Sequence, residues 1–180
     1  VINNAQDKVI FFDKTFLPIV SNIRDRLETV EKFVLMSEPD EEIAAQFPGL
    51  LFYEEFLQRG TPNANWPEIA ENQASSLCYT SGTTGRPKGA VLGQAAMRAN
   101  AEMSHHAYAM TPDDLVLNIL PLFHVGGLNI QPLPALLVGA GVVIHDGFDP
   151  AAVLATISSE SITQMTVVPT ILGALLGAPE

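Results

Sequence analysis

The stretch of the sequence with the clearest chemical potential is YTSGTTGRPKG, at positions 79–89. Seven of its eleven residues are Gly, Ser or Thr, and two of the chain's nine basic residues lie in it. Gly82 and Gly85 permit backbone angles that bring peptide N–H groups close to an anion. Lys88 adds a mobile positive charge. Hydroxyl groups able to reach a phosphate oxygen or a metal come from Thr80, Ser81, Thr83 and Thr84.

These residue types predict a phosphate-binding loop, with a flexible surface loop that binds nothing as the alternative. The spacing disfavours a Walker-type NTPase or kinase, which requires G-x-x-x-x-G-K-[ST]. Here Gly82 and Gly85 are three apart, and Lys88 lies between Pro87 and Gly89. The loop is therefore of another kind.

The elements around this stretch predict where it lies. Short apolar runs typical of strands occupy residues 8–12, 32–36, 75–79, 115–120, 141–145 and 163–168. Helical patterns occupy residues 16–27, 93–108, 128–137, 150–157 and 169–176, and residues 43–56 fit either type. The alternation predicts an α/β fold with a mainly parallel sheet flanked by helices. Ligands bind beyond the carboxyl ends of such strands, where residues 79–89 begin.

Composition excludes several classes of protein. The net charge of −11 disfavours a nucleic-acid binder, which needs a basic face. No run reaches the roughly 18 apolar residues of a membrane span, so we expect a cytoplasmic, soluble protein. One cysteine, Cys78, permits no disulfide framework. The Pro- and Asn-rich residues 61–67 predict a linker that divides residues 1–70 from residues 71–180.

All eleven positions of the opening stretch resemble the signature phosphate loop of the acyl-adenylate-forming superfamily. That superfamily contains acyl-CoA synthetases, luciferases and the adenylation domains of peptide synthetases. LPLFHVGGL, at 120–128, resembles its next core motif, and TVVPT, at 166–170, is similar to a third. With VIFFD and WPEIAENQASSLCYT, the whole chain looks most like a medium- or long-chain fatty-acyl-CoA ligase. Gly93 and Gln94 depart from the Ser or Thr followed by His that relatives often carry there.

The resemblance implies a role for each matching residue. The β- and γ-phosphates of ATP would be held by Thr80, Ser81, Gly82, Thr83, Thr84, Gly85 and Lys88. Thr80 could also touch Mg²⁺, and Lys88 would offset charge on the departing pyrophosphate. His124 would lie at the wall between the nucleotide and acyl sites, with Gly126 and Gly127 leaving room for substrate. The implied reactants are a carboxylic acid, ATP and coenzyme A.

Further motifs that the resemblance leads one to expect are missing, among them a YG-x-TE-like segment and a C-terminal catalytic lysine. We therefore expect an internal piece of the N-terminal domain, without the C-terminal domain and inactive alone. Open alternatives are a non-catalytic nucleotide- or phosphate-binding module, an aryl-CoA ligase, a peptide-synthetase adenylation domain and a purely structural fragment. His124 could instead be a core histidine, and apolar residues 120–144 could be core rather than an acyl tunnel. A homodimer stays open.

Overall fold

The computed structural model describes residues 1–62, 65–80 and 85–178. The chain divides into two compact units. The first unit contains Val1–Ile69 and Leu77–Val91, and the second contains Ala70–Ser76 and Leu92–Glu180. Two paired strands, β4 (Ala74–Thr80) and β5 (Lys88–Gly93), contribute residues to both units. The predicted division at residue 70 stays a prediction.

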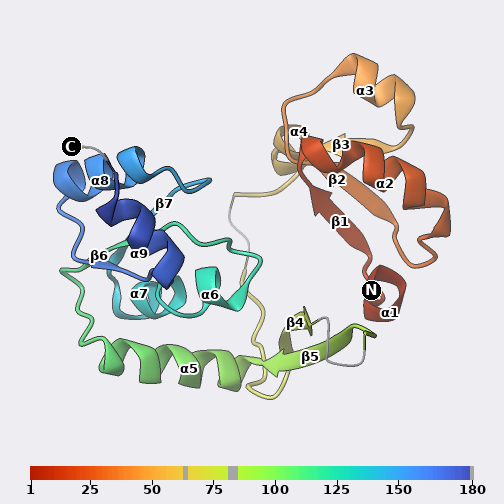
Figure 1. The fold of residues 1–180 in the computed structure, drawn as a ribbon. Coiled ribbons are helices and arrows are strands. Elements are labelled where there is room, and N and C mark those ends of the chain that lie inside the picture. The colour runs from red at the N-terminus through yellow and green to blue at the C-terminus, as the bar shows by residue number, and fades with distance from the viewer. Residues whose placement is uncertain (63–64, 81–84, 179–180) are drawn as a thin grey trace. The chain divides into compact units, whose positions relative to one another are not determined.

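The first unit holds a three-stranded parallel sheet in the order β1-β2-β3 (Figure 1). Its elements in chain order are α1 (Ile2–Ala5), β1 (Val9–Phe12), η1 (Lys14–Phe16), α2 (Leu17–Ile23), η2 (Arg24–Arg26), β2 (Lys32–Leu35), α3 (Glu41–Gln46), β3 (Leu50–Phe52) and α4 (Tyr53–Gln58). Residues 43–56, which fitted either type, thus contain parts of two helices and one strand.

Helices cover both faces of this sheet because successive strand residues point to opposite sides. Phe12 is buried in a core with Val20 of α2 and Ile43 of α3. Its neighbour Phe11 meets Phe56 of α4 edge-on, with ring centroids 5.8 Å apart. Each short helix therefore gains its stability from packing on the sheet rather than from its own length.

The second unit holds another three-stranded parallel sheet, in the order β7-β6-β8. Its elements are α5 (Gln94–Ala107), β6 (Leu115–Asn118), α6 (Val125–Leu128), α7 (Pro132–Val138), β7 (Gly141–Ile144), α8 (Pro150–Glu160), β8 (Gln164–Met165) and α9 (Pro169–Leu176). Helix α5 packs along α7.

The central strand β6 places one side chain into each of two cores. Val116 packs with Ala135 of α7, and Leu117 packs with Val153 of α8 and Leu175 of α9. Val116 and Leu117 are almost fully buried, as expected for a strand covered on both faces. The predicted fold class, α/β with mainly parallel strands flanked by helices, is confirmed.

The structure differs from the sequence-based prediction at two elements. The single helix predicted over residues 128–137 is wrong, since α6 ends at Leu128 and α7 begins at Pro132. Pro132 fits the first position of a helix, where its missing N–H is unused, so the chain restarts there. Strand β5 was not predicted, because its glycines conceal the strand pattern. No helix among the described residues is both long and apolar enough to cross a membrane.

Candidate functional site

The predicted phosphate loop connects strands β4 and β5. Thr80 is the last residue of β4 and Lys88 the first of β5, and both are exposed. Ser81, Gly82, Thr83 and Thr84 lie outside the described residues. Gly85 has φ +74°, a left-handed conformation that glycine adopts without a steric cost. The described ends of the loop therefore place a hydroxyl and an ammonium group at the ends of two paired strands.

Lys88 is available to bind an anion. In the described ranges of the chain it forms no salt bridge, whereas Arg98 pairs with Glu102 at 2.7 Å between Nε and Oε1. An exposed, unpaired ammonium on a chain of net charge −11 creates a local positive potential. That potential is what an anionic ligand requires.

His124 lies in the second unit, as the N-cap of α6. Its Nδ1 accepts a hydrogen bond of 3.0 Å from the backbone N–H of Gly126. An accepting Nδ1 leaves the proton of a neutral imidazole on Nε2, which is then a donor for a ligand. The side chain is exposed in this chain, and the alternative interpretation of His124 as a core histidine stays a prediction.

Gly127 makes possible the tight turn after β6. A Cβ atom at this position would lie 2.1 Å from the carbonyl oxygen of Pro121 and 2.5 Å from that of Leu120. Both distances are far below van der Waals contact, so only glycine fits. At Gly126 the nearest atom would be His124 Nδ1, at 3.2 Å. The two glycines therefore differ in their surroundings, because backbone atoms leave no room for a Cβ at Gly127 but do not obstruct one at Gly126.

An apolar groove of about 520 Å³ lies at the carboxyl ends of β6 and β7. Residues 119–123 and 144–148 form its walls, together with Ile171 of α9. Two of its lining side chains, His145 and Asp146, are ionisable. The Nε2 atom of His145 lies 3.0 Å from Thr156 Oγ1 of α8, so its ring is held in place. We name this feature the strand-end groove.

The sequence predicted half of this groove. Residues 120–123 belong to the second motif, whereas residues 141–145 were predicted only as a strand and no role was predicted for residues 146–148. The residue types at positions 144–148 do not indicate a binding site. These residues line the groove because β7 pairs with β6. The strand order could have identified them, since neighbouring parallel strands end at the same edge of a sheet.

The predicted site residues are thus distributed over both units. Thr80, Gly85 and Lys88 lie in the first, and His124 lies in the second with Gly126 and Gly127. Over the described part of the chain, no three His, Cys, Asp or Glu side chains gather into a metal site. The Thr80 hydroxyl suits Mg²⁺, which commonly takes only one or two protein ligands beside phosphates and water.

Known proteins similar to this chain include a family of enzymes and several CoA ligases. The AMP-binding enzyme family matches residues 1–180. A medium-chain-fatty-acid–CoA ligase of Ectopseudomonas oleovorans is 39% identical over 99% of the chain. A 3-methylmercaptopropionyl-CoA ligase of Ruegeria lacuscaerulensis is 40% identical over 98%. The chain spans 33% of the length of each of these relatives.

A solved structure shows the same fold. The anthranilate CoA ligase AuaEII, crystallised in complex with anthranoyl-AMP, superposes with a TM-score of 0.85 at 24% identity. The match covers 96% of this chain and 33% of that protein. The resemblance inferred from YTSGTTGRPKG and LPLFHVGGL is confirmed by the family match along the entire chain. This chain belongs to the AMP-binding enzyme family.

Proposed function

We propose that the full-length protein carrying this sequence activates an aliphatic, fatty carboxylic acid with ATP and transfers the acyl group to coenzyme A. In the first step, a carboxylate oxygen attacks the α-phosphorus of ATP, and the bond to the bridging oxygen breaks to release pyrophosphate. In the second, the coenzyme A thiolate attacks the acyl carbonyl carbon and displaces AMP. The observation that carries this proposal is the family match over all 180 residues.

The first step brings one anion onto another, so its barrier is largely electrostatic. Lys88 would place its ammonium group against the departing pyrophosphate, where negative charge accumulates. The hydroxyl of Thr80, and those of Ser81, Thr83 and Thr84, would donate to phosphate oxygens, while Gly82 and Gly85 would admit the phosphates to the backbone. Mg²⁺, when bound through the phosphates and Thr80, would supply further neutralisation.

We propose the strand-end groove as the site of the acyl chain. Its walls are mostly apolar, and its volume of about 520 Å³ falls in the usual range for small-ligand sites. His124 immediately follows the wall segment 119–123, so its Nε2–H group could donate to the substrate at one end of the groove. A straight hydrocarbon chain would gain about 0.8 kcal/mol from each buried methylene.

ATP–pyrophosphate exchange with the full-length protein tests the proposal. The panel should include straight-chain acids of increasing length together with aryl and amino acids. We expect exchange that depends on the acid, with KM falling about four-fold per added methylene until the groove is full. A preference for aryl or amino acids would contradict the proposed acyl class.

A second measurement separates the enzyme from a binding module. ATP binding is followed by calorimetry in the same preparation. ATP binding without exchange for any acid would favour a non-catalytic nucleotide-binding module and overturn the proposed reaction. The cytoplasmic location stays a prediction, and a homodimer stays an open alternative.

A further inference from the structure

Tyr79, next to the last residue of β4, makes a contact that the phosphate loop itself does not require. Its hydroxyl donates a hydrogen bond to Oδ1 of Asn4, 75 positions earlier in the chain. Asn4 belongs to α1, the short helix that opens the first unit. Both residues lie in that unit, so the bond joins its start to the strand that leads into the loop.

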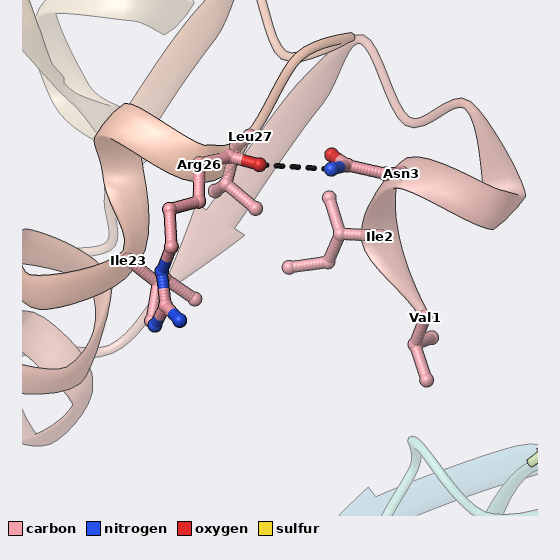
Figure 2. Close-up of a pocket in the computed structure, with 6 residues that line it drawn as sticks. All are labelled: Val1, Ile2, Asn3, Ile23, Arg26 and Leu27. Atoms are coloured by element: carbon pink, nitrogen blue, oxygen red, sulfur yellow. Dashed lines mark hydrogen bonds between the residues drawn. The ribbon is translucent and has the colours of Figure 1, made fainter. Parts of the chain in front are cut away.

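The helix that carries Asn4 is itself anchored. Four residues cannot hold a helix by their own hydrogen bonds in water. Asn3 Nδ2 donates to the carbonyl oxygen of Arg26 at 2.8 Å, as Figure 2 shows, and its Oδ1 accepts from the N–H of Glu28 at 3.1 Å. Ile2 faces Leu27 across the same pocket. Asn4 is therefore a fixed acceptor for Tyr79.

The ring of Tyr79 lies directly over the backbone of Gly89. A Cβ atom at Gly89 would lie 3.1 Å from Tyr79 Cζ and 2.9 Å from Leu77 Cδ1. A side chain at Gly89 would therefore require the Tyr79 ring and the end of the Leu77 side chain to shift. Gly89 is bonded to Lys88, so the ring holds the backbone that carries the proposed phosphate-binding ammonium group.

We propose that Tyr79 is a positioning residue for Lys88, held in place by Asn4. The contacts that join Asn4, Tyr79 and Gly89 form what we call the tyrosine brace. The inference rests on the proposed function, since it assigns Lys88 to the phosphates. A point charge stabilises a transition state only from the correct place, and a displacement of about 1 Å can cost 100-fold in rate.

The test uses the variants Tyr79→Phe and Asn4→Ala, singly and together, in the full-length protein. Each removes one partner of the hydrogen bond and keeps an aromatic ring at position 79. We expect each single variant to lower kcat about two- to ten-fold, with the KM for the acid unchanged. The double variant should match the single ones, because both break the same contact. Single-variant effects that multiply in the double variant, or an unchanged kcat, would overturn the brace.

Hydrogen exchange of the peptide that contains residues 85–93 is a readout that needs no catalysis. Both variants should speed exchange at these amides, whereas Tyr53→Phe should not. Tyr53 is a matched control in the same unit, because its hydroxyl makes no hydrogen bond with a described residue and its ring remains 6.4 Å from that of Phe11. Unchanged hydrogen exchange in Tyr79→Phe would sink the inference. If the wild-type protein is inactive but the variants show the expected changes in hydrogen exchange, the proposed function alone is refuted.

Discussion

The β4–β5 hairpin and the strand-end groove differ in chemistry, so the ligands proposed for them would be recognised by different means. On the hairpin, residues 85–91 are all exposed, and recognition would come from Lys88 and from hydroxyl and N–H donors. The groove, by contrast, is built from two loops and one helix, and its lining is mostly apolar. A single well-placed cation can bind an anionic group, whereas a groove that fits a hydrocarbon chain must be built from several segments that are distant in the sequence.

This difference has a consequence for mutations. A change in the hairpin should affect every acid alike, because the triphosphate is common to all reactions. A change in the groove should discriminate between acids, because only the acyl chain differs. The predictions below use this contrast, from the largest expected effect to the smallest.

Lys88→Ala should have the largest effect. Loss of a charge-stabilising group of this kind lowers kcat by about 10²–10³, and we expect a similar loss of exchange with every acid of the panel. The matched control is Arg98→Ala, since Arg98 is an exposed cation already paired with Glu102. If ATP–pyrophosphate exchange persists in Lys88→Ala, or is lost only with long acids, the hairpin and the groove do not have the separate roles proposed for them.

Gly127→Ala should reduce stability more than any other single methyl addition considered for the second unit. The added Cβ would lie 2.1 Å from a backbone oxygen, which cannot rotate away. We expect the free energy of unfolding to fall by about 3 kcal/mol, as measured by urea titration.

Gly126→Ala is the matched control for this variant. Its Cβ would meet only movable side chains, those of His124 at 3.2 Å and Leu120 at 3.8 Å, so the change should stay within about 1 kcal/mol. If both variants lose the same free energy of unfolding, the loss comes from the change within helix α6 and not from the backbone oxygens around Gly127.

The same contrast explains how much could be predicted from the sequence. The phosphate loop and Lys88 are local, because their glycines, hydroxyls and charge are contiguous. The alternation of strands and helices was also readable, and it gave the correct fold class. The groove wall at residues 144–148 was not, because it depends on β7 lying beside β6. Nor was the Asn4–Tyr79 contact, which spans 75 positions between unremarkable residues.

Gly147→Leu should change acid preference without a general loss of activity. Gly147 lines the groove, and a Cβ there would meet nothing within 4 Å. The new side chain would occupy space proposed for the far end of a long acyl chain. We expect kcat/KM to fall about 10- to 100-fold for acids that fill the groove and to stay constant for short ones. A uniform loss for all acids would remove the groove from acyl recognition.

Asp114 should affect stability and its pH dependence while leaving acid preference unchanged. It lies at the amino end of β6, away from the groove, where Oδ1 accepts from Thr163 Oγ1 at 2.7 Å and Oδ2 from the N–H of Thr111 at 2.7 Å. The hydrogen bond from Thr163, and then that from Thr111, hold the pKa of the Asp114 carboxyl below its usual value. The stability from these bonds is therefore present above about pH 4, the unfolded pKa, and is lost as the pH falls through the folded pKa.

In urea titrations, Asp114→Asn should thus be less stable than wild type at pH 7, and the difference should shrink below about pH 4. Asp113→Asn is the control, because the neighbouring carboxylate makes no hydrogen bond with a described residue. A constant difference at every pH would mean that Asp114 acts through something other than its charge. A changed acid preference in Asp114→Asn would mean that the groove depends on a charged residue at the opposite end of β6. The apolar groove would then not be independent of charge, as its comparison with the hairpin assumes.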